Sequence, residues 1–152
     1  MNVNSLIHRS YSVGGSYIFP LVRLNAGYFH YTAEQAAAIG NRKDNAYTVS
    51  AKLTPGGAFD YELGYQTIKA ENAGFNGDAT STLTPYADAS KATAAGSGKK
   101  GTVYGSVFYH LSRRTEVYAV ADYMKLKDNY RVAATNGFAN QTEFGVGIRT
   151  RF

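Results

Sequence analysis

The sequence predicts an all-β fold, a transmembrane antiparallel β-barrel, and three observations support this prediction. Apolar and polar residues alternate with a period of two along several segments, as in strands that have one apolar and one polar face. The connections between these segments alternate between short turns and long loops. The chain also contains 13 Tyr and 8 Phe but no Trp or Cys, and tyrosine suits a boundary between apolar and aqueous surroundings.

Seven segments are predicted to be strands. They are residues 9–19, 21–32, 45–53, 58–69, 101–111, 115–125 and the carboxyl-terminal segment 142–152. The apolar face of segment 101–111 remains open, because two sets of large side chains compete for it. One set is Val103, Val107, Tyr109 and Leu111, and the other is Tyr104, Phe108 and His110.

The connections are predicted from Gly, Pro and polar clusters. Short turns are expected near Pro20, at 54–57 and near Arg113, and long loops are expected at 33–44, 70–100 and 126–140. Residues 33–39 contain helix formers and are expected to make one or two helical turns. The small and polar run 87–100 is expected to be a mobile part of its loop.

Aromatic residues near the ends of the strands are predicted to form the girdles that anchor a barrel in a bilayer. They are Tyr11, Phe19, Tyr28, Tyr47, Tyr65, Tyr109, Tyr123 and Phe152. Mean hydropathy is −0.31. No stretch approaches the roughly 18 apolar residues of a membrane helix. A strand that faces lipid needs no such stretch, because its apolar residues alternate with polar ones.

The carboxyl-terminal segment carries a resemblance to a known family. Phe144, Val146, Ile148 and Phe152 recur at every second residue, and Arg151 precedes the final Phe. This pattern resembles the closing strand of Gram-negative outer-membrane barrels, and more narrowly the general diffusion porins of the β-proteobacterial type. Residues 10–17 followed by 24–31 resemble a porin hairpin. The resemblance implies that these four apolar residues are an assembly signal for the barrel-assembly machinery.

The number of strands bears on domain organisation. A closed single-chain barrel normally has an even number of strands, because an open sheet edge in lipid leaves costly unpaired backbone groups. Residues 1–152 are therefore expected to be the carboxyl-terminal part of a single barrel domain of about 16 strands, the size that leaves an aqueous channel. The first nine residues lack the pattern of a signal peptide. An eighth strand from residues 2–8 is the alternative, giving a small barrel with a structural or adhesion role.

Polar side chains on the face opposite the apolar residues are predicted to line the lumen. They are Arg23, Asn25, Lys52, Glu62, Gln66, Glu116, Asp122, Glu143 and Arg149. The formal net charge is +5, and basic charge along a confined lumen would favour anions. The same residues could instead form ion pairs in the wall that only stabilise the barrel, and both interpretations remain open.

Other classes of function have little support. His8, His30 and His110 have no metal-ligand spacing and no paired Ser or Asp, so they are expected to be interfacial or loop residues. The glycines do not form a nucleotide-binding fingerprint. No contiguous basic stripe indicates nucleic acid as a partner. A hydrolase site at a barrel rim, using His30 or His110, is the remaining enzymatic alternative; we expect no enzyme, no cofactor and no metal.

The porin resemblance also implies a function and partners. It implies a water-filled channel in the outer membrane of a Gram-negative bacterium, through which small hydrophilic solutes, anions in preference, diffuse passively. The implied partners are the lipid bilayer, the barrel-assembly machinery and two further copies of the chain in a homotrimer. The constriction residues of this family come largely from earlier strands, so none is assigned here.

Overall fold

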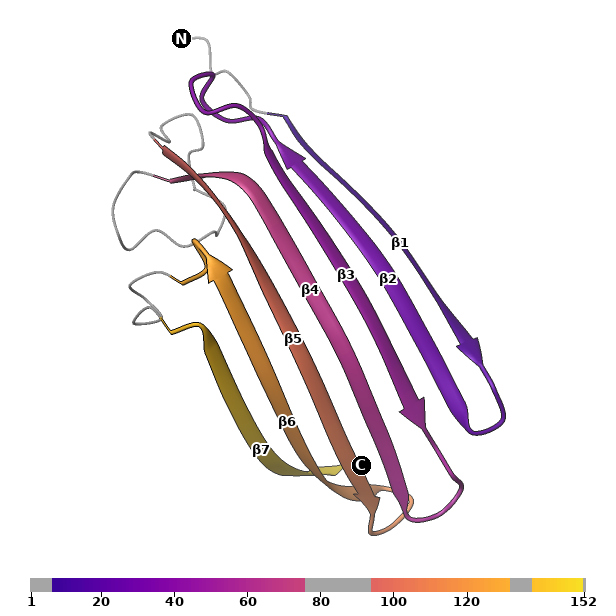
Figure 1. Ribbon diagram of the computed structural model, residues 1–152. Coiled ribbons are helices and arrows are strands. Elements are labelled where there is room, and N and C mark those ends of the chain that lie inside the picture. The colour runs from indigo at the N-terminus through magenta and orange to yellow at the C-terminus, as the bar shows by residue number, and fades with distance from the viewer. Residues whose placement is uncertain (1–6, 76–93, 132–137, 152) are drawn as a thin grey trace.

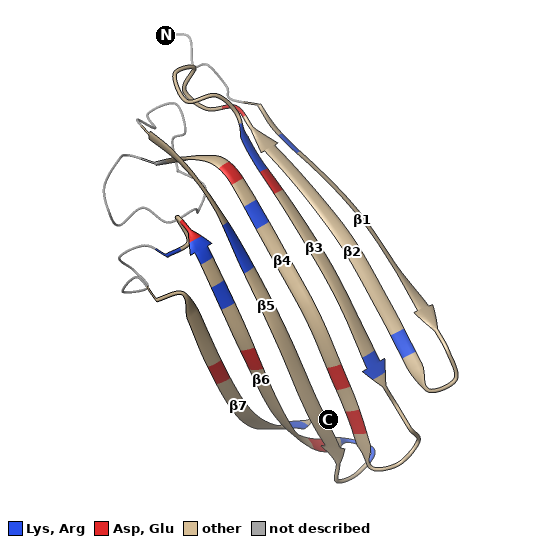
Figure 2. Ribbon diagram, viewed as in Figure 1, with Lys and Arg blue, Asp and Glu red and all other residues tan. Residues whose placement is uncertain are grey.

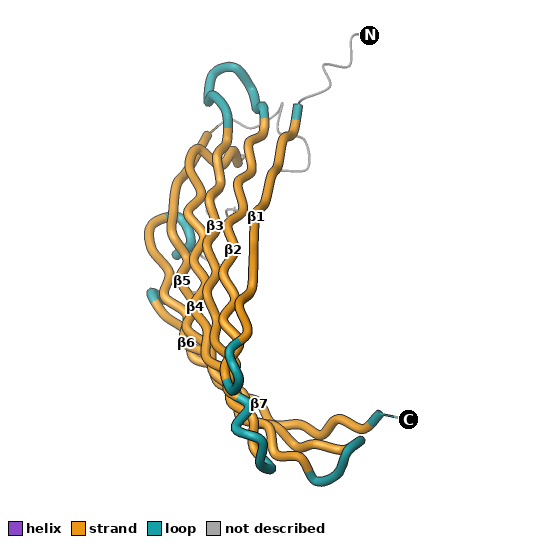
Figure 3. The backbone as a smooth tube through the Cα atoms, turned by 90° about the vertical axis from the view of Figure 1, so that its right-hand side faces the viewer, coloured by secondary structure: helices purple, strands orange, loops and turns teal. Residues whose placement is uncertain are grey.

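The computed structural model describes residues 7–75, 94–131 and 138–151. These residues form one seven-stranded antiparallel sheet whose strands follow each other in chain order (Figure 1). The strands are β1 (His8–Ile18), β2 (Val22–Ala33), β3 (Arg42–Leu53), β4 (Phe59–Phe75), β5 (Ala94–His110), β6 (Thr115–Asp128) and β7 (Asn140–Thr150). The sheet is curved (Figure 3), and β1 and β7 form its two edges. The predicted all-β antiparallel fold is confirmed, and the described residues form an open sheet rather than a closed barrel.

Two strands extend into a region that the sequence predicts to be a long loop. Residues 70–75 belong to β4 and residues 94–100 belong to β5, so the loop prediction was wrong there. Alanine, glycine and serine have little preference for strands, but pairing with neighbours overrides local preference. Gly98, for example, pairs with Ala70 on one side and Asp128 on the other. Residues 76–93 lie outside the described residues, including the first half of the run 87–100 that was predicted to be mobile. The second half, residues 94–100, is paired in β5, so the prediction of a mobile segment was wrong there.

The helical turns predicted at residues 33–39 are not formed. Ala33 ends β2, and residues 37–39 make a turn in which the Ile39 N–H donates to the Ala36 carbonyl at 2.9 Å. Residues 42–44, also predicted to be loop, are the first residues of β3. Pairing with β2 holds all three residues in the sheet, and Lys43 and Asp44 also pair with β4.

The two ends of the sheet differ as the sequence predicts. Short turns at residues 19–21, 54–58 and 111–114 lie at the end where the chain terminates (Figure 1). Backbone hydrogen bonds tie this short-turn end together: the Thr54 N–H donates to Leu21 O at 2.8 Å, and the Arg151 N–H donates to Arg114 O at 2.9 Å. The longer connections leave from the opposite end, which we call the long-loop end.

Strand register divides the side chains between an apolar and a polar face, and it settles the orientation of β5. Val103 pairs with Tyr65 on β4 and with Tyr123 on β6, so it belongs to the apolar face. Tyr104 and His110 therefore lie on the polar face. The apolar set of β5 is Val103, Val107 and Tyr109, which continues the apolar rows of the neighbouring strands.

The two faces differ in how far they are covered. Apart from glycines, the buried residues within the strands lie on the polar face; they are Ala33, Arg42, Asp44, Ala70, Ala73, Thr102, Glu116 and Leu126. On the apolar face of β7, by contrast, Phe144, Val146 and Ile148 are 74%, 72% and 65% exposed. A soluble domain covers the apolar face of its sheet with a second layer. No such layer is present among the described residues.

Two tyrosine–glycine pairs fix the register on the polar face. The Tyr104 ring covers Gly64, its direct partner across β4 and β5, so a Cβ at Gly64 would lie 2.2 Å from the ring. The Tyr118 ring covers Gly147 in the same way across β6 and β7, at 2.5 Å. A side chain at either glycine would meet the ring and displace it, so glycine is favoured at both positions.

Candidate functional site

The polar face brings together all nine residues that the sequence predicts to line a lumen. Cross-strand partners point to the same side of a sheet, so register alone assigns a face. The nine residues are Arg23, Asn25, Lys52, Glu62, Gln66, Glu116, Asp122, Glu143 and Arg149. They are distributed over β2, β3, β4, β6 and β7. Strand pairing therefore assembles one continuous polar surface from residues that are far apart in the sequence.

Two basic residues lie directly opposite each other on this face. Arg23 of β2 pairs with Lys52 of β3. The Arg23 guanidinium donates to Asn25 Oδ1 at 3.0 Å, and the Asn25 amide donates to Ser50 Oγ at 3.1 Å. Uncharged groups therefore hold Arg23 in place, and its positive charge is not neutralised by these contacts.

Two acidic residues occupy the corresponding place on the other side of the sheet. Asp122 of β6 lies directly opposite Glu143 of β7. Asp122 Oδ1 is shielded and has no hydrogen-bond partner among the described residues. Glu143 accepts a hydrogen bond from the Gln141 amide. The basic pair Arg23 and Lys52 thus lies on β2 and β3, and the acidic pair Asp122 and Glu143 lies on β6 and β7, which contributes a field across the polar face. Figure 2 shows that charges of both signs occur on β3 and β6.

Five charged or titratable side chains near the short-turn end form a chain of contacts, which we call the alternating row. Lys52 Nζ lies 3.4 Å from Asp60 Oδ2, and His110 Nε2 lies 3.3 Å from the same oxygen. His110 Nδ1 lies 3.3 Å from Glu116 Oε2, and Glu116 also pairs with Arg149. The row thus crosses five strands, from β3 to β7, with basic groups and carboxylates in turn.

The sequence did not indicate the roles of Asp60 and His110 in this row. His110 was expected to be an interfacial or loop residue without a partner, yet it lies on β5 between two carboxylates. Asp60 lies on the polar face of β4, but no spacing in the sequence links it to a histidine 50 positions later. Only the register of β4 against β5 brings the two together.

A hollow of about 550 Å³ opens beside the alternating row. Its charged lining consists of the cations Lys52, Arg113, Arg114, Arg149 and Arg151 and the carboxylates Asp60 and Glu116. His110 also lines it. The excess of positive side chains makes the hollow favourable for anions.

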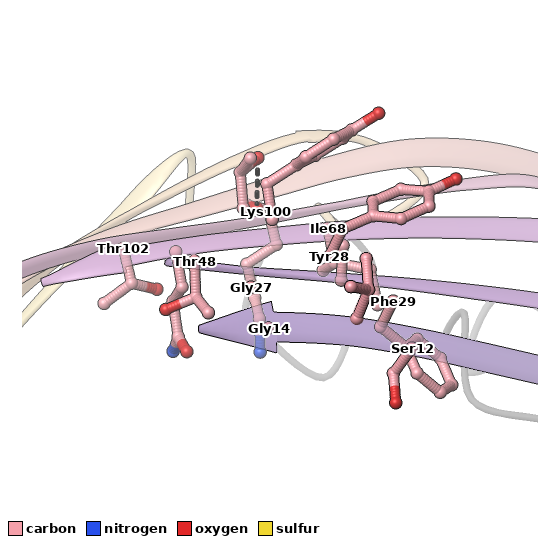
Figure 4. Close-up of a pocket in the computed structure, with 14 residues that line it drawn as sticks. Ser12, Gly14, Gly27, Tyr28, Phe29, Thr48, Ile68, Lys100 and Thr102 are labelled. Carbon is pink, nitrogen blue, oxygen red and sulfur yellow. Dashed lines mark hydrogen bonds between the residues drawn. The ribbon is translucent and has the colours of Figure 1, made fainter. Parts of the chain in front are cut away.

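A second hollow, of about 560 Å³, is lined by residues of β1 to β5. Register places Gly14, Gly27, Thr48, Gln66 and Thr102 in one cross-strand row on its polar side. In Figure 4 the side chains of Thr48 and Thr102 extend to one side and that of Tyr28 to the other. The buried Thr102 hydroxyl has no hydrogen-bond partner among the described residues. Small polar groups of this kind suit contact with water.

The comparison with protein families adds an independent observation. The profile of the family described as Gram-negative porin matches residues 2–129, well over half of the chain. The chain belongs to the Gram-negative porin family. It is accordingly a non-enzymatic channel protein of the outer membrane, in contact with the lipid bilayer and with solutes that diffuse passively. A search of curated proteins found no match.

The porin match and the predicted assembly signal cover different parts of the chain. Residues 142–152, which carry the strongest resemblance in the sequence, lie beyond the matched range. Phe144, Val146 and Ile148 form one exposed apolar line on β7, as the alternation predicts. Phe152 lies outside the described residues. No helix in the described part of the porin chain is long and apolar enough to cross a membrane.

The long-loop end of this porin is held together by a clamp between a loop and β4. The Gln35 amide donates to Asn72 O at 2.6 Å and to Gly40 O at 2.9 Å, while the Gly74 N–H donates to Gln35 Oε1 at 2.6 Å. Asn72 lies in a bulge of β4, has φ of 58°, and donates from its side chain to Ile39 O. The clamp fixes the loop at residues 34–41 against the sheet.

A buried ion pair and a tyrosine lie beneath this clamp. The Arg42 guanidinium contacts both carboxylate oxygens of Asp44, at 3.0 and 2.9 Å from Nε, and both side chains are at most 8% exposed. Tyr130 packs against Ala70 and Ala73. Burial raises the pKa of the Tyr130 phenol, and the nearby Asp44 carboxylate adds to this rise. These contacts make the long-loop end the most closely packed region of the described residues.

Proposed function

We propose that the polar face is the wall of a water-filled channel through which small hydrophilic solutes, anions in preference, diffuse across the outer membrane. The observation that carries this proposal is the division of a single sheet into two unlike faces. The apolar face is uncovered over most of its surface, as a lipid-facing surface is, and the polar face carries all nine predicted lining residues. Shielded polar atoms on that face, such as Asp122 Oδ1, would be satisfied by channel water.

The orientation of charge supports an anion preference. Cations outnumber carboxylates in the hollow at the short-turn end, and Arg23 lies directly opposite Lys52. Planar-bilayer recordings of the intact protein under a KCl gradient test this. We expect Arg23→Gln combined with Arg149→Gln to lower the anion-to-cation permeability ratio.

The matched control is Arg9→Gln combined with Lys43→Gln, which removes the same charge from the opposite face of the sheet. We expect this control to leave the reversal potential unchanged. An unchanged reversal potential in the Arg23 and Arg149 variant would mean that these residues form ion pairs of the wall and do not set selectivity.

We further propose that the sheet is part of a barrel of about 16 strands. Among the described residues, β1 pairs only with β2 and β7 only with β6. An edge of this kind within lipid costs several kcal/mol for each unpaired backbone group. The proposal is tested by measuring the intact mass of the native protein isolated from outer membranes. The peptide of residues 142–152 identifies the protein in that sample. A mass well above twice 16.5 kDa supports it, whereas a mass near 16.5 kDa favours the small barrel with a structural role.

Assembly is the last part of the proposal. The exposed line of Phe144, Val146 and Ile148, followed by Phe152, would be recognised by the barrel-assembly machinery, and the folded barrel would form a homotrimer. Deletion of Phe152 should lower the amount of protein in the outer membrane while total synthesis is unchanged. Normal outer-membrane levels would contradict the assembly role, and the native mass of the detergent-extracted complex would test the trimer.

A further inference from the structure

An aromatic ring is exposed on the polar face of the sheet, within the second hollow. Phe29 follows Gly27 by two residues on β2, so both residues share the polar face. Phe29 is 40% exposed and lines the hollow, and in Figure 4 its side chain extends away from that of Tyr28. Apolar surface that meets water is unfavourable, so the ring would gain from contact with an apolar group of a solute.

The neighbours of this ring are too small to cover it. Phe29 pairs with Ser12 of β1 and with Ala46 of β3. Gly27 pairs directly with Gly14, so a stretch of bare backbone lies beside the ring. Glycine lets another group approach the backbone closely. A planar ring would fit against this backbone and contact Phe29 at its face or its edge, as aromatic pairs prefer.

The hollow also contains a lysine between apolar neighbours. Lys100 of β5 pairs with Ile68 of β4 and with Leu126 of β6. No carboxylate among the described residues forms an ion pair with Lys100. In Figure 4 its side chain extends to the same side as those of Thr48 and Thr102. Its positive charge therefore lies at the hollow without a counter-charge from the described part of the chain.

A hydroxyl group without a partner lies on the same face as this lysine. Thr102 follows Lys100 by two residues on β5, at a rise of about 7 Å along the strand. Thr102 is 5% exposed and lines the hollow, and its Oγ1 has no hydrogen-bond partner among the described residues. A buried hydroxyl group without a partner is costly. A carboxylate here would accept hydrogen bonds from both the ammonium and the hydroxyl group.

We propose that the second hollow binds a small aromatic carboxylate of the size of benzoate as it moves along the channel wall. The inference rests on the proposed function, in which the polar face lines the lumen. The aromatic ring would contact Phe29 and the glycine backbone, and the carboxylate would contact Lys100 and Thr102. The volume of about 560 Å³ lies within the range of small-molecule pockets, about 300–1,000 Å³. An uncharged ring or a small aliphatic anion would make only one of the two sets of contacts.

Saturation-transfer NMR of the intact protein in detergent micelles tests binding separately from conduction. Benzoate is compared with acetate, which lacks the ring, and with benzamide, which lacks the charge; empty micelles supply the blank. We expect a dissociation constant of about 1 mM for benzoate, because a channel must release what it binds. Acetate and benzamide should bind at least about fivefold more weakly, since each loses one set of contacts.

Substitutions locate the site within the hollow. F29A should weaken benzoate binding about fivefold through loss of the ring contact, and K100Q about tenfold through loss of a charge-assisted hydrogen bond. K100R should bind like the wild type. The control F108A removes a ring from the polar face outside the hollow, and the control K99Q removes a charge from the opposite face. Both controls should leave benzoate binding unchanged.

The outcomes separate this proposal from the proposed function. Wild-type protein that conducts KCl but binds benzoate no more tightly than acetate and benzamide would overturn the site and leave the channel function standing. That result requires no variant to fold. Equal benzoate affinity in the wild type, F29A and K100Q would also overturn the site. Absence of KCl conductance would contradict the proposed function, whereas selective benzoate binding in micelles would still support the site.

Discussion

Two rows of charged residues cross β4, β5 and β6, at opposite ends and on opposite faces of the sheet, and they differ in the order of positive and negative charges. In the alternating row, Asp60 and Glu116 separate the basic groups, so each charge has an opposite neighbour. On the apolar face near the long-loop end, Lys69 of β4, Lys99 of β5 and Lys127 of β6 lie opposite one another, and we call these three lysines the cationic rim. A row that alternates in sign is neutralised within the protein. In a row of one sign, each charge instead repels its neighbours.

The largest expected effect comes from breaking the alternating row at its most buried member. Glu116 is 8% exposed and joins His110 to Arg149. Glu116→Gln should lower the free energy of unfolding by about 2 kcal/mol, at the low end for a buried pair because Arg149 is half-exposed. Urea unfolding in detergent micelles measures this. The control Glu62→Gln removes a carboxylate of the same face that forms no ion pair with any described residue, and equal losses in both variants would contradict the role of the row.

The next effect concerns the register on which the row depends. In Gly147→Ala the new methyl group would meet the Tyr118 ring, and displacement of the ring should cost about 1 kcal/mol of unfolding free energy. In the control Gly15→Ala, the new methyl group meets no atom within 4 Å. Unfolding in micelles should therefore separate the two variants. If Gly147→Ala is as stable as the control, the ring does not fix the register of β6 and β7.

A third change makes the cationic rim resemble the alternating row. Lys99→Glu would place a carboxylate between Lys69 and Lys127, and in micelles free of anionic lipid it should raise the free energy of unfolding by about 0.5 kcal/mol. Lys125→Glu is the control, because its cross-strand partners Gly101 and Asn140 are uncharged. A destabilised Lys99→Glu variant would show that the lysines do not repel one another.

The smallest effect is the response of the two rows to salt. Screening should weaken the repulsion between the exposed lysines of the rim. The free energy of unfolding of the wild type should therefore rise by about 0.2 kcal/mol between low and physiological ionic strength. The loss caused by Glu116→Gln should change less, because Glu116 is shielded from solvent. Unfolding curves at several KCl concentrations measure the salt dependence of the wild-type stability and of the loss caused by Glu116→Gln. A larger salt response at Glu116 than in the rim would reverse the comparison.

The sequence predicts the strands and their faces well, because a period of two needs only local information. It correctly assigned all seven strands and the two unlike ends. It could not orient segment 101–111, since Val103 and Tyr104 are both large and apolar enough for the outer face, and only pairing with Tyr65 decides. It also missed residues 94–100, where backbone pairing overrides a composition of Gly, Ala, Ser and Lys.

The charged sites could be predicted only in part, for a related reason. The sequence predicts that Arg23, Lys52 and Glu116 lie on the polar face, but it does not predict their neighbours on other strands. His110 meets Asp60, and Lys69 meets Lys99, only once the register of β4 and β5 is known. Register depends on turns and on tyrosine–glycine contacts between distant residues. Which charged residues lie next to each other could therefore not be predicted from composition.

The clamp formed by Gln35 and Asn72 has a consequence for recognition from outside the cell, which the long loops of an outer-membrane barrel face. Because hydrogen bonds to β4 hold residues 34–41 in one shape, this loop presents a fixed surface instead of a changing one. An antibody raised against the folded protein should recognise that shape and bind a linear peptide of the same residues poorly. Gln35→Ala would release the loop and should abolish the epitope while leaving every residue that the antibody contacts from 36 to 41 in place.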